Sequence, residues 1–263
     1  MQFLHWQNSR GDFLKKQAER ASMLGLNIDR LTMNESVDRA LQLIASGGPH
    51  QHVVVNAAKV VAAVEDESVL RTINGCSIVN VDGQSVVWAS RLLGDALPER
   101  VAGIDFMNRL VEESARSGLR IYLLGARSHV VAAAATTFRN RGAVVVGCHD
   151  GYWRRIKSDA EMTAEIAALK PDILFIAVPS PFKENFLSEN LQGLGAKLCV
   201  GVGGSFDIVA GLTSRAPIWM QRAGLEWLFR LAQEPHRMMR RYLVGNTKFI
   251  YYVLRARISS GGN

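Results

Sequence analysis

One carboxylate in this sequence is well placed to take a proton from a substrate. Asp82 directly follows the apolar run Ser77–Val81 and precedes Gly83. A carboxylate at the end of a strand, inside a cleft, can serve as a general base. Aspartate also commonly caps a helix, and a helix is expected to begin near Gln84. We therefore predict that Asp82 is the catalytic base, with helix capping as the alternative.

A glycine-rich turn follows the last expected strand. Gly203 and Gly204 precede Ser205, which begins a short helical segment. Glycines let a backbone approach a ligand closely, and N–H groups at a helix start favour phosphate. The spacing matches neither the dinucleotide fingerprint GxGxxG nor a P-loop. We predict that this turn contacts nucleotide phosphates, and a plain strand-to-helix turn is the alternative.

Other polar residues follow expected strands or precede expected helices. In a parallel α/β sheet, ligands bind in the crevice beyond the carboxyl ends of the strands. Asn56 could orient a sugar hydroxyl or cap the next helix, and Arg100 could pair with a diphosphate. Asp105 is expected to be a helix cap. The remaining candidates for substrate binding are Gly125, Tyr152, Ser180, Lys183, Glu184 and Asp207.

The sequence contains no pattern typical of a metal or cofactor site. It has no DxD triplet, no HExxH motif and no cysteine or histidine group with zinc spacing. The 3 cysteines are widely separated, which indicates a reducing compartment and no disulfide framework. The acidic run at 65–67 is typical of a solvated helix face. We predict no metal and no cofactor.

Apolar runs predict a Rossmann-like α/β body over residues 24–214. Short β-branched runs alternate with helical patterns, which favours a parallel sheet covered on both faces. The expected strands are His52–Val55, Ser77–Val81, Arg120–Leu124, Ala143–Gly147, Ile173–Val178 and Lys197–Val202, with Leu26–Asp29 as an added edge strand. The expected helices are Asn34–Ala45, Ala57–Asn74, Gln84–Leu93, Asp105–Ser117, His129–Arg141, Asp159–Leu169 and Pro181–Leu194. Residues 1–23 are expected to form a polar leader.

Residues 215–263 are interpreted as a basic helical C-terminal appendage. They hold 9 Lys and Arg against 2 Asp and Glu, whereas the preceding 214 residues hold 22 of each. Aromatic residues beside arginines in a helical pattern suit the surface of an anionic membrane. The arginines expected to meet the membrane or a lipid diphosphate are Arg215, Arg222, Arg230, Arg237, Arg240 and Arg241. The alternatives are a helix docked on the body and a nucleic-acid-binding segment, and no known motif supports the latter.

Several long motifs resemble those of one enzyme family. The C-terminal signature of the WecG/TagA/CpsF glycosyltransferases, glycosyltransferase family twenty-six, is similar to GVGGSFDIVAG and RAPIWMQRAGLEWLFRLAQEP. The resemblance runs from about Leu24 to Arg241 and includes NVDGQSVVWASRLLG and DILFIAVPSPFKE. It implies an inverting, metal-independent transferase with a nucleotide-diphosphate-sugar donor and a polyprenyl-diphosphate-linked sugar acceptor. The family's base, strand-end asparagine and pyrophosphate-side arginine fall on Asp82, Asn56 and Arg100.

Two departures from the family pattern bear on the donor sugar. Val54 stands where the family often has threonine, and Lys183 replaces the glutamine of its SPKQE motif. These changes favour a donor other than UDP-N-acetylmannosamine. We expect UDP-glucose and a β-1,4 linkage, in exopolysaccharide assembly of the xanthan type. The alternatives are a UDP-N-acetylmannosamine(uronate) transferase, a dinucleotide oxidoreductase and a non-enzymatic membrane adaptor.

The expected partners are a UDP-sugar, a polyprenyl-diphosphate-linked sugar and an anionic membrane surface. Nucleic acid is not expected, and a homo-oligomer is allowed. The sequence has neither a secretory h-region nor a run of about 18 uncharged apolar residues. We therefore expect a peripheral protein at the cytoplasmic face of the inner membrane.

Overall fold

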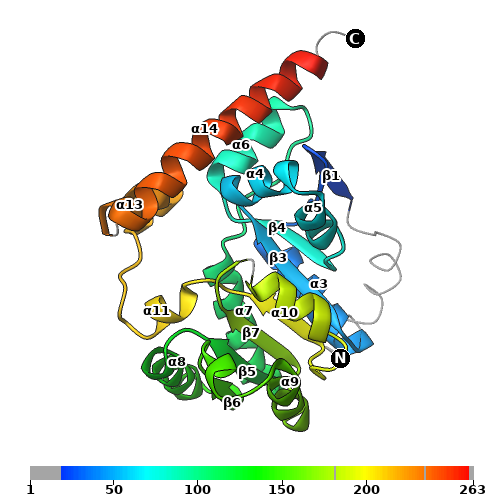
Figure 1. Ribbon diagram of the computed structural model, residues 1–263, viewed down its shortest axis with the longest axis vertical. Helices are drawn as coiled ribbons and strands as arrows, with labels where there is room; N and C mark the ends of the chain where they lie inside the picture. Colours follow the sequence, from blue (N-terminus) through cyan, green and yellow to red (C-terminus); the bar gives the residue numbers. More distant parts are fainter. Residues whose placement is uncertain (1–18, 181, 234, 261–263) are drawn as a thin grey trace, which may run out of the picture.

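A six-stranded parallel sheet forms the centre of the molecule. The computed structural model describes residues 19–180, 182–233 and 235–260, without the side chains at 236–238, 240–244 and 260. The sheet order is β4-β3-β8-β7-β5-β6. Its strands are β3 (His50–Val55), β4 (Ile78–Val81), β5 (Arg120–Gly125), β6 (Val144–His149), β7 (Ile173–Ala177) and β8 (Leu198–Gly201). The prediction of a Rossmann-like α/β body is confirmed (Figure 1).

The central strands are continuous apolar runs because both faces of the sheet are covered. Every residue of β7 is buried. Since side chains alternate between the faces of a strand, Ile173 and Phe175 join one hydrophobic cluster and Leu174 and Ile176 join another. A strand exposed on one face would instead show an alternation of apolar and polar residues.

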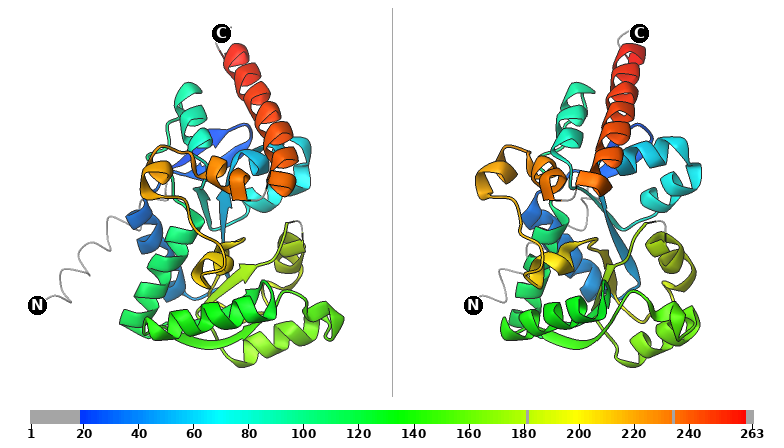
Figure 2. Two further views of the ribbon diagram at one scale, coloured as in Figure 1. Left: turned by 90° about the vertical axis from the view of Figure 1, so that its left-hand side faces the viewer. Right: turned by 60° about the vertical axis from the view of Figure 1, so that its left-hand side comes forward.

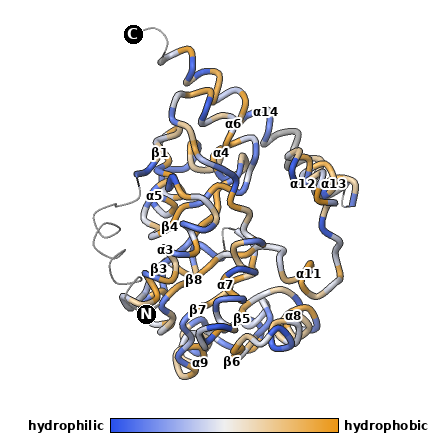
Figure 3. Tube along the Cα trace, turned by 180° about the vertical axis from the view of Figure 1, so that it is seen from behind, coloured by the Kyte–Doolittle hydropathy of each residue, from blue (hydrophilic) through white to orange (hydrophobic). Residues whose placement is uncertain are grey.

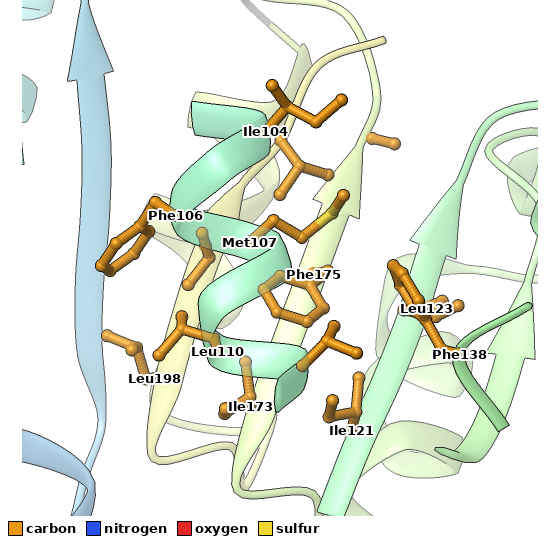
Figure 4. Packing of buried hydrophobic residues seen from close by; sticks show 14 of the residues in the cluster. Ile104, Phe106, Met107, Leu110, Ile121, Leu123, Phe138, Ile173, Phe175 and Leu198 are labelled. Carbon is orange, nitrogen blue, oxygen red and sulfur yellow. The ribbon is translucent and has the colours of Figure 1, made fainter. Parts of the chain in front are cut away.

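Helices cover the two faces. One face carries α3 (Met33–Ser46), α7 (Gly103–Ser117), α8 (Ser128–Asn140) and α11 (Ser205–Val209). The other carries α4 (Ala57–Glu65), α5 (Glu67–Asn74), α6 (Gln84–Leu92), η1 (Trp153–Arg155), α9 (Asp159–Ala168) and α10 (Phe182–Asn190). Figure 4 shows Phe106, Met107 and Leu110 of α7 directed at the sheet, where Phe175 and Leu198 belong to the same cluster. This packing fixes the position of α7 beside the strand ends.

Two expectations about local structure are wrong. The helix expected over Ala57–Asn74 is broken at Asp66, whose carboxylate accepts backbone N–H groups and caps α5. Leu26–Asp29 is strand β2, but it pairs antiparallel with β1 (Arg20–Met23) in a separate two-stranded sheet. The leader expected over residues 1–23 therefore overlaps β1, and its residues 1–18 lie outside the described part of the chain.

The C-terminal segment folds into α12 (Ile218–Arg222), α13 (Glu226–Gln233) and α14 (Pro235–Ser260). The last of these helices lies against the body (Figure 2), where Phe249 and Val253 are only 4% and 5% exposed. Both belong to the hydrophobic cluster that α4 and α6 share. Glu65, at the end of α4, accepts hydrogen bonds from Lys248 at 2.7 Å and Tyr252 at 3.1 Å. Helix α14 of the appendage is thus docked on the body through these residues.

Hydrophobic and hydrophilic positions are interspersed along α14 (Figure 3). Within the described ranges, no helix has the length and apolar character needed to span a bilayer. The acidic run at 65–67 is exposed, as expected. Two of its residues also have structural roles, because Glu65 binds Lys248 of α14 and Asp66 caps α5.

Candidate active site

A cavity of about 500 Å³ opens beside the ends of β3 and β4. Asn56 and Asp82, the residues that follow these two strands, line it together with Arg100. Helices α6, α13 and α14 supply further lining residues, among them Glu226 and Arg230. The cavity lies where a parallel sheet places its ligands, and its volume is typical of small-molecule sites, about 300–1,000 Å³.

Asp82 does not cap the helix that follows it. The N-cap of α6 is Gly83, and no side chain makes a capping hydrogen bond there, so the capping alternative is wrong. Burial raises the pKa of Asp82 to about 6, although Arg100 and Arg230 oppose the rise. A carboxylate with this pKa is mostly ionised at neutral pH, yet it is far more basic than an ordinary aspartate. Such a value suits a general base.

Space around Asp82 is kept open by a glycine at the start of α7. A Cβ atom built on Gly103 would lie 3.8 Å from Asp82 Oδ2 and 3.5 Å from a Val54 methyl group. The Gly103 N–H also donates to Asp82, which lowers the pKa of the carboxyl. Val54, one of the two departures from the family pattern, therefore lies close to the predicted base.

Three arginines converge on one buried carboxylate at the rim of the cavity. Glu226 of α13 is 8% exposed. Arg100 Nη1 donates to its Oε2 at 2.9 Å, Arg215 Nε donates to Oε1 at 3.4 Å, and Arg230 Nη2 lies 3.9 Å from Oε1. Burial by itself would raise the pKa of Glu226, but the three arginines outweigh it and hold the pKa below its usual value. Because Glu226 remains ionised, it can hold the guanidinium groups beside Asp82.

Asp105 takes part in this arginine cluster and does not cap α7. The N-cap of α7 is Ala102, so the sequence-based expectation is wrong. Asp105 lies in the first turn, where its two oxygens accept from Arg215 Nη1 at 2.5 Å and Nη2 at 2.7 Å. This bidentate pair fastens the start of the C-terminal segment to the body.

The six arginines predicted to meet the membrane do not all lie on the same surface. Arg215 and Arg230 face Glu226, whereas Arg222 on α12 is exposed. The side chains of Arg237, Arg240 and Arg241 lie outside the description. The contact of these residues with a membrane or a lipid diphosphate stays a prediction.

Asn56 has the structural role that was held as an alternative. Its Oδ1 accepts from the Lys59 amide at 3.1 Å, and it is the N-cap of α4. The same residue lines the cavity beside Asp82. A contact between Asn56 and a sugar hydroxyl therefore stays a prediction. The capping hydrogen bond to Lys59 fixes the position of the Asn56 side chain.

Three other predicted residues form a second polar cluster. The Ser180 hydroxyl donates to Glu184 Oε1 at 2.9 Å, Lys183 Nζ lies 3.3 Å from the same oxygen, and Lys59 Nζ lies 3.7 Å from it. Glu184 Oε2 is buried, and no described residue forms a hydrogen bond with it. None of these four residues lines the cavity at Asp82.

Sequence reasoning missed Lys59, although a signal was present. It is the single charged side chain in the apolar helix run AAKVVAAV, just after a strand end. Burial, and then the charge of Lys183, lower the pKa of Lys59 to about 8. An amine in that state is a candidate for contact with an anionic ligand group.

The backbone conformation and the close neighbours of Gly125, at the end of β5, require glycine there. Its φ is +127°, and a Cβ would lie 2.4 Å from the Ala177 carbonyl oxygen. At Gly203 and Gly204, by contrast, an added Cβ meets nothing within 4 Å, so the backbone there borders open space. Ser205 gives both its amide and its hydroxyl to the Val202 carbonyl, which shapes the turn.

Two of the candidates for substrate binding, Tyr152 and Asp207, are proposed to contact the nucleotide and lie on the surface around the strand ends. Tyr152 is 48% exposed. The Arg155 guanidinium carbon lies over its ring, 4.7 Å from the ring centroid. Asp207 lies in the first turn of α11 and is partly exposed. Their contact with a nucleotide stays a prediction. Among the described residues, no group of three or more His, Cys, Asp or Glu is arranged to hold a metal ion.

Residues 21–262 match the model of the Glycosyl transferase WecG/TagA/CpsF family. The chain belongs to this family. The matched range covers both the body and the C-terminal helices. Arg100 and Glu226, which form an ion pair, therefore both lie within it. The resemblance found in the sequence motifs is confirmed at this level, and with it the class of enzyme, a glycosyltransferase.

Two relatives carry the same printed name, N-acetylglucosaminyldiphosphoundecaprenol N-acetyl-beta-D-mannosaminyltransferase. One, from Bacillus spizizenii (strain ATCC 23059 / NRRL B-14472 / W23), is 34% identical over 176 residues, which are 66% of this chain and 66% of the relative. The other, from Bacillus subtilis (strain 168), is 31% identical over 188 residues, 71% of this chain and 72% of the relative. Both names give N-acetylmannosaminyl, not glucosyl, as the group transferred, so the expected glucosyl donor and the link to xanthan stay predictions.

Proposed function

We propose that this protein transfers a sugar from a UDP-sugar to a sugar linked to polyprenyl diphosphate. The observation that carries the proposal is Asp82, a carboxylate whose pKa is raised to about 6 at the edge of a cavity that also presents arginines. Family membership supports the reaction class. The printed names of both relatives support an acceptor built on a diphosphate and undecaprenol.

In the proposed reaction, Asp82 accepts the proton of the acceptor hydroxyl as its oxygen attacks the anomeric carbon of the donor. The bond between that carbon and the UDP oxygen breaks, and the configuration at the carbon inverts because attack comes from the opposite side. A positioned base of this kind contributes about 10²–10⁴ to the rate. Burial supports the role, because it makes the carboxylate more basic at neutral pH.

Negative charge that develops on the departing diphosphate is assigned to the arginine cluster. Arg100 and Arg230 line the cavity with Asp82, and Glu226 holds both of them from one side. Guanidinium groups fixed in this way stabilise phosphate oxygens without a metal ion. Backbone N–H groups near Gly203 and Gly204 are proposed as further donors to the nucleotide.

The donor sugar is proposed to be glucose, with N-acetylmannosamine as the second candidate. Val54 and Lys183 depart from the family pattern. A Cβ atom built on Gly103 would lie 3.5 Å from a Val54 methyl group and 3.8 Å from Asp82 Oδ2, so Val54 is near the predicted base. The second candidate is favoured by the printed names of both relatives. The β-1,4 linkage and a role in exopolysaccharide assembly belong to the glucose proposal.

A direct assay decides between the donors. The purified protein is incubated with UDP-glucose or UDP-N-acetylmannosamine and with a prenyl-diphosphate-linked sugar, and the product mass is read. A hexose increment supports the first donor, and an N-acetylhexosamine increment supports the second. The Asp82→Asn variant is the control and should form little product. If the wild-type protein transfers no sugar from any UDP-sugar in a broad panel, the proposed function is wrong.

The proposed working place is an anionic membrane surface at the cytoplasmic face. Ile218 and Trp219 of α12 are 66% and 65% exposed, and Ile258 near the end of α14 is 77% exposed. Exposed arginines such as Arg222 accompany them. Apolar side chains beside cations favour binding at the headgroup level of a bilayer.

A further inference from the structure

An apolar groove leads from the predicted base to the outside of the molecule. Trp88 and Leu92 of α6 line one side, and Ile250 and Leu254 of α14 line the other. We refer to these four residues, with Ala89 and Val253 at its bottom, as the α6–α14 groove. Both helices stand at the end of the molecule that carries the C-terminus, with a gap between their ribbons (Figure 2), and residues of both line the same cavity.

The groove keeps large apolar side chains in contact with water. Trp88, Leu92, Ile250 and Leu254 are 55%, 48%, 56% and 51% exposed, respectively. Within each helix the two residues are four positions apart and therefore lie on one face. Contiguous apolar surface of this kind marks a binding site more often than scattered single residues do.

The length and direction of the groove suit an extended hydrocarbon chain better than a sugar. On α14 the cavity lining runs from Asn246 to Leu254, which is about 12 Å along a helix axis at 1.5 Å per residue. At its inner end lie Asp82, Arg100 and Arg230. The site therefore changes from charged to apolar along one direction.

An acceptor with a sugar, a diphosphate and an isoprenoid chain has the same order of groups. With its sugar hydroxyl at Asp82 and its diphosphate beside Arg100 and Arg230, its hydrocarbon must leave the cavity along a path. Of the cavity walls, the α6–α14 groove offers apolar side chains on both sides of such a path. The ribose, diphosphate and sugar of a UDP-sugar are polar and gain little from burial against aliphatic side chains such as Leu92 and Leu254.

We infer that the α6–α14 groove binds the first isoprene units of the lipid-linked acceptor. This inference rests on the proposed function and adds the place where the hydrocarbon is recognised. The groove guides the diphosphate toward the arginines, so that chain length contributes to the affinity for the acceptor. Because α14 supplies half of the groove, docking of α14 on α4 through Phe249 and Val253 sets its width.

The test compares acceptors of different chain length in detergent micelles, where vesicle binding plays no part. The same sugar diphosphate is offered on a methyl group, which has no isoprene unit, and on an undecaprenyl chain. The double variant Leu92→Gln/Leu254→Gln should lose about tenfold in kcat/KM for the long acceptor, a change of about 1.4 kcal/mol, and retain the wild-type value for the short one. Ile258→Gln is the matched control, because Ile258 is exposed on the same helix and does not line the cavity.

A second measurement does not depend on turnover. A prenyl diphosphate that carries a photoreactive group near its first isoprene units is irradiated with the full-length protein, and labelled peptides are identified by mass spectrometry. Labels on α6 and α14 that the double variant loses support the inference. Labels confined to other elements overturn it, even if sugar transfer is never observed.

If the groove binds something other than the isoprenoid chain, the double variant should behave differently. If the double variant loses binding to lipid vesicles while the ratio of long-chain to short-chain transfer is unchanged, the groove contacts the bilayer and the inference is wrong. If light scattering shows a wild-type dimer that the double variant dissociates, again with an unchanged ratio, the occupant is a second copy of the chain. An absence of transfer to either acceptor by the wild-type protein contradicts the proposed function, and the labelling experiment then decides the inference alone.

Discussion

Replacement of Asp82 by asparagine should stabilise the protein while it removes most of the activity. Asparagine has nearly the same shape and can still accept from the Gly103 N–H, but it carries no charge. The ionised carboxylate is disfavoured in the folded protein, since burial raises its pKa from 3.8 to about 6. Loss of a general base lowers the transfer rate by about 10²–10⁴. Activity and stability should therefore change in opposite directions.

The size of the stabilisation follows from the pKa difference between the folded and unfolded states. The folded pKa lies above the unfolded value, so the favourable contribution of Asp82 is fully present below about pH 3.8 and is lost as the pH rises through about 6. The shift of about 2.2 units corresponds to about 3 kcal/mol at pH 7. At pH 5 about half of that remains, and at pH 4 less than about 1 kcal/mol. The Asp82→Asn variant gains these amounts relative to the wild type.

Urea unfolding at pH 4, 5 and 7 measures the difference directly. Glu67→Gln is the control, because Glu67 lies on the surface of α5 with its side chain 77% exposed, and its effect should stay within about 0.5 kcal/mol. A gain that grows from pH 4 to pH 7 agrees with the reasoning. Equal stability of the Asn variant and the wild type at pH 7, or near-normal sugar transfer by that variant, would refute the assignment of Asp82 as a buried base.

Four further predictions can be checked with the same protein. Glu226→Gln should lower kcat at least tenfold and lower the free energy of unfolding, since the partly buried Arg100 and Arg215 lose their charged partner; unchanged kinetics would show that the arginine cluster has no part in catalysis. Transfer should survive EDTA, and a loss that magnesium or manganese restores would contradict a metal-independent reaction. Lys183→Gln should shift the ratio of UDP-N-acetylmannosamine to UDP-glucose use toward the former, which product mass measures; an unchanged ratio would remove Lys183 from donor selection. Sedimentation with anionic vesicles should weaken as salt rises, with about 1 kcal/mol per cation near the surface, and equal binding to neutral vesicles would show that charge is not the attraction.

The structure also changes how the membrane prediction should be tested. Truncation before Arg215 would remove Phe249 and Val253 from the cluster that covers α4 and α6. It would also remove Glu226, which holds Arg100. A truncated body would thus lose core packing and the arrangement of the cavity together. Single substitutions at exposed positions such as Trp219 and Arg222 test membrane contact without this side effect.

The sequence by itself determined the sheet and the place of the predicted base. Runs such as Ile173–Ala177 are apolar at every residue, and that pattern is stable only in a strand buried on both faces. Once the sheet is parallel, its carboxyl ends must form one edge, so Asp82 and Asn56 were expected at a common site. The family motifs added the reaction class, which periodicity does not encode.

Local patterns did not determine the ends and faces of several helices. Asp66 lies within a continuous helical pattern, and only its capping of α5 shows that the helix is broken there. Likewise, an amphipathic helix such as α14 has an apolar side whether that side meets lipid or protein. The burial of Phe249 and Val253 against α4 decided that part of it meets protein.

Only the tertiary structure brought the charged groups of the site together. Arg100 and Glu226 are 126 positions apart in the sequence, and Asp105 and Arg215 are 110 apart. No periodic pattern relates residues at such distances, because their contact depends on how the C-terminal segment returns across the strand ends. The raised pKa of Asp82 also depends on tertiary structure, because burial raises it and Glu226 of the C-terminal segment adds to the rise, whereas Arg100 and Arg230 oppose it. The sequence supplied the chemical groups, and long-range packing set their charges and their distances.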